Sequence, residues 1–233
     1  MTSPVADTPP PAQHESGFSA WRYALSLSPG EQRRCLDVQR LHQLVLQGWR
    51  PPHLRTAVPA PAPRVLYAAR RIPPAREEGT GHRVAGRPIT LLVQASAPAD
   101  WQPLLDSRIL TGARSRQVLH TFAHGERVTV RVIANPSKKI PRKAGRTSLR
   151  TPEECGAWLR RHLNDALSIQ PHDVLVSDAE RLTGKSGTLT FPCRELQASG
   201  TVQDPAALYA ALAQGIGPTR AYGCGLLRIH TAN

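Results

Sequence analysis

The sequence predicts an α+β fold made of two similar units, because the order strand, helix, strands occurs twice along the chain. Trp21 to Leu27 and Arg127 to Ile133 each alternate between apolar and polar residues, as half-buried strands do. Each run is followed by a helical pattern and then by further short apolar runs. Two such units of about 100 residues are typical of tandem ferredoxin-like (βαββαβ) domains, an RRM-like architecture.

The elements of the first unit follow in order after the Trp21–Leu27 strand, which Ser28-Pro29-Gly30 breaks. A helix is expected from Asp37 to about Gln47, because one stripe of it is apolar: Val38, Leu41, Leu44 and Val45. Gly48 ends this helix, and a proline-rich extended loop covers residues 51–63. Strands are expected at 64–69 and 89–94, separated by a polar loop at 77–86.

The second unit continues after the Arg127–Ile133 strand with a capping box. Thr151 and Glu154, with Pro152 at the first helical position, open a helix that we expect to reach about Leu167. Asp204 caps a last helix that ends at Gln214. The remaining strands are expected near 173–176 and 187–191, with a possible edge at 200–202 and a closing strand at 226–229.

These elements divide the chain into three parts. Residues 1–18 hold four prolines and few large apolar residues, so we expect a disordered tail. An N-terminal domain is expected at 19–120 and a C-terminal domain at 125–233, with the joint between His120 and Gly125.

The charge balance indicates a polyanionic partner. The 233 residues carry 30 Lys and Arg against 17 Asp and Glu, which gives a net charge of +13.

A membrane span needs roughly 18 uncharged apolar residues, and no window approaches that length. The start of the chain lacks the basic and apolar regions of a secretory signal. We therefore expect a cytoplasmic protein that does not associate with membranes.

The cysteines favour neither a zinc site nor disulfides. Cys35, Cys155, Cys193 and Cys224 lie far apart and form no Cys-x-x-Cys pair. Reduced and mostly buried thiols are the better interpretation. His120 and His124 have a spacing that suits a metal on a helix, but Gly125 favours a loop and a third ligand is lacking. We expect neither a metal nor another cofactor.

One stretch holds most of the excess charge. Residues 127–150 contain eight basic residues and no acidic one: Arg127, Arg131, Lys138, Lys139, Arg142, Lys143, Arg146 and Arg150. Charge runs are usually solvated surface, but a loop this unbalanced repels itself unless a polyanion neutralises it. The run contains no aromatic residue, so a stacking platform for single strands is disfavoured. Backbone contact with structured RNA fits better.

A glycine-rich segment follows the last expected helix. Gly215, Gly217, Gly223 and Gly225, with Arg220 between them, exceed what a helix cap requires. The segment precedes a strand and so cannot be a dinucleotide-binding turn, which opens a helix. A backbone loop packed closely against phosphates is the functional alternative to a plain cap.

At this segment the sequence resembles a known family. The run 221–227 (AYGCGLL) resembles the glycine-rich signature of CRISPR repeat-processing endoribonucleases, in particular the CasE branch, the type I-E Cascade subunit. Leu91–Gln94 with Ala99–Trp101, and Arg131–Pro136 followed by Lys138-Lys139 and Trp158-Leu159, agree with the family in order. The resemblance extends from about Trp21 to Ile229.

The resemblance implies two ferredoxin-like domains and metal-independent cleavage at the base of the repeat hairpin of CRISPR precursor RNA. A ribose 2′-hydroxyl attacks the adjacent phosphorus and leaves a 2′,3′-cyclic phosphate and a 5′-hydroxyl. The catalytic histidine of the family corresponds to His42. On the expected helix, His42 lies at the border between the apolar stripe and the polar face, a position that is typical of an ordinary boundary residue but also allows contact with a ligand.

The resemblance also implies further site residues. Lys185, in the loop 183–187, is the candidate for stabilising negative charge in the transition state, although a plain turn explains this loop equally well. Arg33 and Arg34 precede the His42 helix and are candidates for RNA contact. The candidates for gripping the RNA are the basic side chains and the glycine-rich backbone: Arg131, Lys138, Lys139, Arg142, Lys143, Arg146, Gly215, Gly217, Arg220, Gly223 and Gly225.

The sequence departs from the family at Gln39. Many members carry a tyrosine three residues before the histidine, and glutamine cannot donate a phenolic proton. Three functions therefore stay open: a catalytic endoribonuclease, a non-catalytic RNA-binding subunit of the same fold, and a general basic nucleic-acid-binding protein. The first implies the repeat RNA hairpin and the other Cascade subunits as partners, with a monomer when the protein is free.

Overall fold

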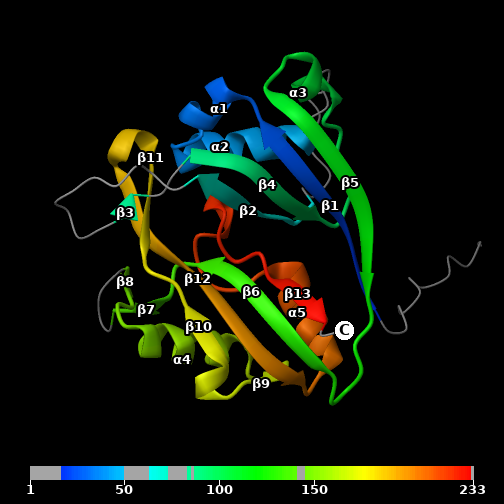
Figure 1. The fold of residues 1–233 in the computed structure, drawn as a ribbon, viewed down its shortest axis with the longest axis vertical. Coiled ribbons are helices and arrows are strands. Elements are labelled where there is room, and N and C mark those ends of the chain that lie inside the picture. The colour runs from blue at the N-terminus through cyan, green and yellow to red at the C-terminus, as the bar shows by residue number, and fades with distance from the viewer. Residues whose placement is uncertain (1–16, 50–62, 73–82, 85–86, 141–144, 232–233) are drawn as a thin grey trace, which may run out of the picture.

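The computed structural model consists of two α+β units that lie one above the other (Figure 1). It describes residues 17–49, 63–72, 83–84, 87–140 and 145–231. The helices are α1 (Pro29–Arg34), α2 (Val38–Leu46), α3 (Gln102–Asp106), α4 (Pro152–Leu163) and α5 (Pro205–Gln214). Short 3-10 turns are η1 (Gln47–Trp49), η2 (Pro171–Asp173), η3 (Lys185–Gly187) and η4 (Arg220–Tyr222).

The strands form two large antiparallel sheets, and the second sheet ends at one edge in a short parallel pair. Strands of the first unit are β1 (Phe18–Leu27), β2 (Val65–Ile72), β4 (Arg87–Ala95) and β5 (Leu110–His120). The second sheet contains β6 (Arg127–Ala134), β9 (Leu167–Ser168), β10 (Val174–Val176), β11 (Glu180–Gly184), β12 (Leu189–Val202) and β13 (Arg228–Thr231). A separate hairpin consists of β7 (Ser137–Lys139) and β8 (Arg146–Ser148), and β3 (Arg83–Val84) pairs in parallel with β11.

Both units have the ferredoxin-like strand order. The first sheet runs β2-β4-β1-β5 and the second runs β13-β6-β12-β11, so in each unit the first and third strands are central. Two βαββαβ units in tandem are therefore present, as the sequence predicts. Because β3 comes from between two strands of the first unit and pairs with β11, the two units are also joined by backbone hydrogen bonds.

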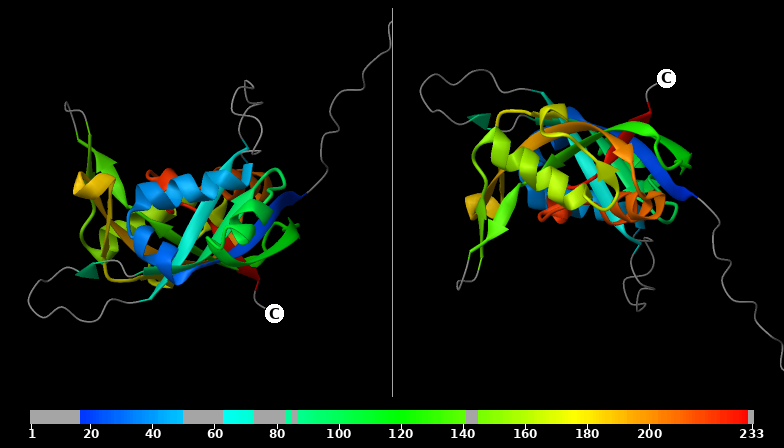
Figure 2. Two further views of the ribbon diagram at one scale, coloured as in Figure 1. Left: turned by 90° about the horizontal axis from the view of Figure 1, so that it is seen from above. Right: turned by 90° about the horizontal axis from the view of Figure 1, so that it is seen from below.

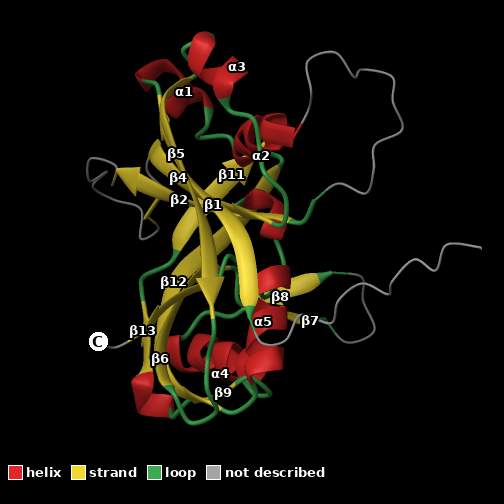
Figure 3. Cartoon of the chain, turned by 90° about the vertical axis from the view of Figure 1, so that its right-hand side faces the viewer, coloured by secondary structure: helices red, strands yellow, loops and turns green. Residues whose placement is uncertain are grey.

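Helix α2 covers one face of the first sheet. Alternate residues of β1, such as Tyr23 and Leu25, pack against Leu41 and Leu44 of α2. The opposite face of β1 is turned toward the second unit, since Phe18 and Ala20 belong to the core that surrounds Trp158. Figure 3 shows α2, α5 and the β7–β8 hairpin on one side of the molecule and β13 on the other, and the views in Figure 2 agree.

Several predicted boundaries differ from the structure. Phe18, assigned to the tail, is buried and starts β1, paired with His120. Helix α4 ends at Leu163 rather than about Leu167, because Leu167 pairs with Val202 in β9. The separate edge expected at 200–202 is the end of β12. The expected loops at 51–63 and 77–86 lie almost wholly outside the described residues.

Helices α1 and α3 and strands β3, β5, β7, β8, β9 and β11 were not predicted from the sequence. The four thiols are free and buried, as expected. No helix in the described part of the chain is both long enough and apolar enough to cross a membrane.

Candidate functional site

His42 lies in the middle of α2, and a capped N-terminus positions that helix. The carboxylate of Asp37 accepts hydrogen bonds from the backbone N–H groups of Gln39 (2.8 Å) and Arg40 (3.2 Å). Leu41 on one side of His42 is buried and Gln43 on the other is exposed, so the imidazole is half-buried at the border predicted from the sequence. A half-buried histidine keeps access to a ligand while its neighbours restrict its rotation.

The side chain that meets His42 comes from the other unit. The ring of Tyr222, in η4, lies edge-on to the imidazole with ring centroids 6.1 Å apart and an interplanar angle of 68°. On its other side Tyr222 packs against Phe191 of β12, with centroids 5.9 Å apart. The contact therefore joins a helix of the first unit to the glycine-rich segment of the second.

The loop that carries Lys185 approaches the start of the same helix. A Cβ atom at Gly184 would lie 2.9 Å from Cγ2 of Val38, so the backbone of this loop is in close contact with α2. Val38 and His42 are four residues apart and therefore occupy one face of the helix. Lys185 is exposed and has a positive φ of 49°, in a turn fixed by Thr188, whose N–H and hydroxyl both donate to the Lys185 carbonyl. The structure thus places the residue before Lys185 against the helix that carries His42. We name His42, Tyr222 and the Lys185 turn the catalytic corner, after the role expected of His42 and Lys185 from the sequence.

The glycines of the C-terminal segment are explained by close packing, partly within the second unit and partly against the first. A Cβ atom at Gly217 would lie 2.5 Å from the indole of Trp158, and one at Gly223 would lie 3.0 Å from the ring of Tyr67. Cβ atoms at Gly215 and Gly225 would likewise lie too close to backbone atoms of the segment itself. All four glycines have positive φ. Close packing therefore accounts for these glycines, and contact between the segment and phosphates stays a prediction.

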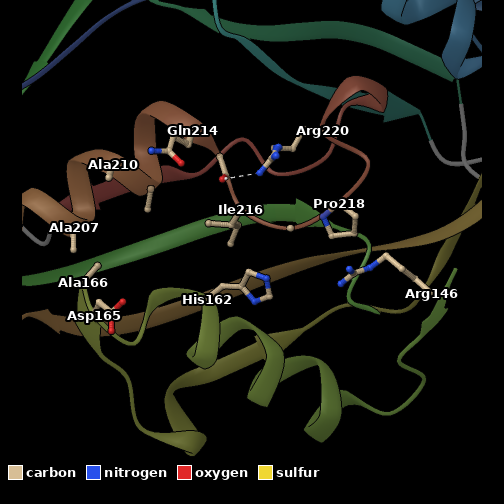
Figure 4. A pocket seen from close by; sticks show the side chains of 13 residues that line it. Arg146, His162, Asp165, Ala166, Ala207, Ala210, Gln214, Ile216, Pro218 and Arg220 are labelled. Carbon is tan, nitrogen blue, oxygen red and sulfur yellow. Dashed lines mark hydrogen bonds between the residues drawn. The ribbon is translucent and has the colours of Figure 1, made fainter. Parts of the chain in front are cut away.

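Beside this segment lies a groove of about 590 Å³ between α4 and α5 (Figure 4). Arg146, from β8, and Arg220, from η4, border it at one end, and His162 of α4 lines its floor. Burial lowers the pKa of Arg220, and the nearby positive charge of Arg64 lowers it further. Two guanidinium groups at one end make the groove attractive to an anion.

The basic stretch forms the β7–β8 hairpin rather than a plain loop. Lys138 and Lys139 are exposed on β7, while Arg146 is fixed by hydrogen bonds to the hydroxyl and the carbonyl of Ser137, at 2.9 and 3.0 Å. Lys138 also has an acidic neighbour, since its Nζ lies 3.9 Å from Glu154. Arg142 and Lys143 lie outside the described residues. We name Lys138, Lys139 and Arg146 the basic arm.

Three other candidates lie elsewhere. Arg131 is exposed on β6 and hydrogen-bonds to Gln197, on the face of the second sheet turned away from α4. The structure thus separates it from the basic arm. Arg33 and Arg34 are exposed at the end of α1, where Arg34 lies 3.5 Å from Glu31. Among the described residues, His, Cys, Asp and Glu side chains nowhere gather in groups of three or more that could hold a metal ion.

Tyr222 is the functional candidate that sequence reasoning missed. An aromatic residue between glycines in a segment already selected was the available signal. Its partner lies 180 residues earlier in the chain, so only the packing of the two units reveals the contact.

Comparison with known proteins adds independent findings. The sequence pattern of the family described as CRISPR associated protein matches residues 20–230. The chain is 26% identical over 156 residues to CRISPR-associated endoribonuclease Cse3 of Thermus thermophilus, which covers 61% of this chain and 73% of that protein. It is 28% identical over 138 residues to the CRISPR system Cascade subunit CasE of Escherichia coli, covering 54% of this chain and 68% of that one.

Solved structures agree. Cse3 of Thermus thermophilus, bound to an RNA that represents a pre-cleavage complex, superposes with a TM-score of 0.73 at 25% identity, over 91% of this chain and 100% of that one. Cas6e of Escherichia coli has the same fold, with a TM-score of 0.61 at 22% identity. The superposition covers 91% of this chain and 100% of that one.

Proposed function

Because the chain belongs to the family of CRISPR-associated proteins, we propose that it is an endoribonuclease that processes CRISPR repeat RNA. Two relatives support this activity, since Cse3 is named an endoribonuclease and CasE a Cascade subunit. The solved Cse3 structure with a pre-cleavage RNA supports RNA as the substrate. After cleavage the protein stays bound to its product as a subunit of the Cascade complex.

The catalytic corner carries the proposal for the mechanism. The imidazole of His42 takes the proton of a ribose 2′-hydroxyl, whose oxygen then forms a bond to the adjacent phosphorus. The bond from phosphorus to the 5′-oxygen breaks, and this oxygen receives the proton that the His42 imidazolium returns. The products are a 2′,3′-cyclic phosphate and a 5′-hydroxyl, and no step requires a metal ion. The ammonium group of Lys185 stabilises the extra negative charge on the phosphoryl oxygens.

The single observation that supports this assignment most strongly is the contact between His42 and Tyr222. A half-buried imidazole held edge-on by an aromatic ring, with a lysine-bearing turn against the same helix, is a preorganised acid–base site. An unperturbed imidazole has a pKa of about 6.5, so it can accept and return a proton near neutral pH.

The basic arm and the groove supply binding. The β7–β8 hairpin, which carries the arm, and α5, which lines the groove, lie on the side of the molecule that also carries α2, as Figure 3 shows. Exposed lysines and arginines contact phosphates without reading bases, so they position the stem of the hairpin with its base at His42.

A non-catalytic RNA-binding subunit of the same fold is the second candidate, and Gln39 is the observation that favours it. The half-buried side chain of Gln39 cannot donate the phenolic proton that the family's tyrosine offers. Tyr222 supplies an aromatic ring to His42 from the other unit, which weighs in favour of the catalytic reading. A general nucleic-acid binder would bind duplex DNA as tightly as hairpin RNA.

The test is cleavage of the cognate repeat RNA in excess EDTA, with the product ends mapped. We expect one cut at the base of the hairpin, with a cyclic phosphate on the upstream product. An RNA with a 2′-deoxy nucleotide at the cut position should bind equally well and remain whole.

Each other outcome selects another function. Tight hairpin binding without cleavage identifies the non-catalytic subunit. Equal affinity for duplex DNA identifies the general binder. Cleavage that needs Mg²⁺ or tolerates the 2′-deoxy nucleotide contradicts the proposed mechanism.

A further inference from the structure

A second group of basic side chains lies at the junction of the two units, away from α2. Arg22 of β1 lies directly opposite Arg116 on the neighbouring antiparallel strand β5. Arg228 of β13, in the second unit, is close enough to affect the charge of Arg22. His120, at the end of β5, is close enough to feel the charges of Arg22 and Arg116. In Figure 1, β13 lies beside the lower parts of β1 and β5. We name Arg22, Arg116, His120 and Arg228 the cationic junction.

Three buried nitrogen atoms of this junction lack a hydrogen-bond partner among the described residues. They are Nη2 of Arg22, Nε of Arg228 and Nε2 of His120. A buried N–H group without an acceptor destabilises the folded protein, and more so when the group is charged. Native proteins therefore rarely retain several such donors in one place, unless a ligand or water satisfies them.

The contacts that the junction does make leave its charge largely uncompensated. Arg22 is only 6% exposed, and its Nε donates to Gln94 (3.0 Å), which in turn donates to the carbonyl of Leu212 near the end of α5 (2.8 Å). This chain relays part of the charge to the negative end of a helix. Among the ion pairs of the described residues, the junction has one, between Arg228 and Glu195 at 2.7 Å.

The positive charges of the junction lower one another's pKa values. Burial lowers the pKa of Arg22 to about 10, and the charges of Arg116 and Arg228 contribute to the decrease. Burial also lowers the pKa of His120, with Arg22 and Arg116 as further causes. Several cations close together at the edge of a core destabilise one another. A bound anion would therefore stabilise the folded protein strongly at this place.

We propose that the cationic junction is a binding site for one phosphate-type oxyanion, held between the two units. Arginine forks match the geometry of a tetrahedral oxyanion with several acceptor oxygens, and here they come from both units. Exposed Arg116 forms the outer side of the site, and Arg22 and Arg228 form its inner side. The oxyanion comes either from free inorganic phosphate or from a phosphodiester of the bound RNA.

This site is distinct from the catalytic corner. Arg22 lies on the face of the first sheet opposite the one that packs against α2, because Tyr23 and Leu25 occupy that other face. The proposal for inorganic phosphate therefore does not rest on His42 or on RNA cleavage. Only the RNA source depends on the proposed function.

The first experiment measures the thermal stability of the RNA-free protein in inorganic phosphate and in chloride at equal ionic strength. Phosphate at about ten times its Kd should raise the Tm by about 3–5 °C. Arg116→Gln should abolish this rise, and because Arg116 is exposed, the substitution leaves the core intact. The matched control is Arg114→Gln, since Arg114 is exposed on the same strand but paired with Ala24, and it should keep the rise.

A second readout is the imidazole of His120, followed by NMR. Bound phosphate offsets the neighbouring positive charges, so the pKa of His120 should rise on addition of phosphate in the wild type and stay unchanged in Arg116→Gln. An equal Tm rise in wild type and Arg116→Gln, with an unchanged His120 titration, would overturn the proposal.

Measurements of RNA binding distinguish the two sources of the oxyanion. If Arg116→Gln weakens binding of a repeat RNA with single-stranded flanks several-fold and leaves the bare hairpin unaffected, the site takes an RNA phosphate. If phosphate stabilises the protein and Arg116→Gln leaves both RNAs unaffected, the site takes free phosphate and joins the two units. Either result is independent of whether the protein cleaves RNA.

Discussion

The catalytic corner and the basic arm lie on the same side of the molecule but are built in opposite ways. In the corner, His42 and Tyr222 are half-buried and held by contacts between segments far apart in the chain. In the arm, Lys138 and Lys139 are exposed on a short hairpin of neighbouring residues. Apart from the exposed Lys185, the corner carries little charge and much packing, and the arm carries much charge and little packing.

This difference implies a division of labour. A packed and oriented imidazole affects how fast a bond breaks, whereas exposed cations affect how tightly a polyanion is held. Changes in the corner should therefore alter the single-turnover cleavage rate at unchanged affinity. Changes in the arm should alter affinity and leave the rate at saturating protein unchanged.

The largest effect after loss of His42 itself is expected from Lys185→Ala. Removal of a group that stabilises transition-state charge typically slows a reaction about 10²-fold. Single-turnover cleavage at saturating protein measures this, and Lys185→Arg, which keeps the charge, should retain most of the rate. If a higher protein concentration restores the rate, Lys185 contributes to binding, and the division of labour between corner and arm does not hold for it.

A smaller loss of rate is expected at Tyr222. Tyr222→Leu removes the ring that lies edge-on to His42 and should slow cleavage about tenfold through misplacement of the imidazole. Tyr222→Phe keeps the ring and should stay within about threefold of wild type. If Tyr222→Phe falls as far as Tyr222→Leu, the hydroxyl rather than the ring is the contributing group.

In the arm, Lys139→Ala should weaken hairpin RNA binding about three- to tenfold and lower the slope of log K against log salt by about 1. Lys138→Ala should do less, because Glu154 already lies 3.9 Å from Lys138. Titrations at several salt concentrations measure both. Equal losses would show that this ion pair leaves Lys138 fully available to RNA.

The smallest effect is expected from thiol reagents. Cys193 and Cys224 are buried in the cluster that contacts Tyr222. Burial raises the pKa of Cys224 to about 11 and raises that of Cys193 further, so little thiolate exists at pH 8. Iodoacetamide should leave both unlabelled in the native protein and label them in denaturant, as mass spectrometry would show. Rapid native labelling would mean that the corner opens.

Local signals in the sequence located much of this architecture. The caps Thr151 and Asp204 are recognisable in the sequence, and each accepts a hydrogen bond from the first turn of its helix. The alternation of Arg127 to Ile133 likewise marked β6, with Val130 and Val132 buried. These features depend on neighbouring residues, so periodicity and capping rules detect them.

Features set by distant pairing escaped prediction. Strand β5 contains Gly112, Arg114, Ser115 and Arg116, which carry no strand pattern, and it forms because β1 pairs along its length. Arg22 occupies a polar position in the alternation of β1, which does not reveal that Arg228 lies near it. The approach of Tyr222 to His42 depends in the same way on how the two units pack.

The most direct test of the division of labour measures cleavage rate and RNA affinity together in His42→Ala and in Lys139→Ala. His42→Ala should lower the single-turnover rate about 10²- to 10⁴-fold and keep the Kd within about twofold of wild type. Lys139→Ala should raise the Kd and keep the saturated rate. If His42→Ala instead weakens binding and cleaves at the wild-type rate once saturated, His42 is a binding residue and the account of the catalytic corner is wrong.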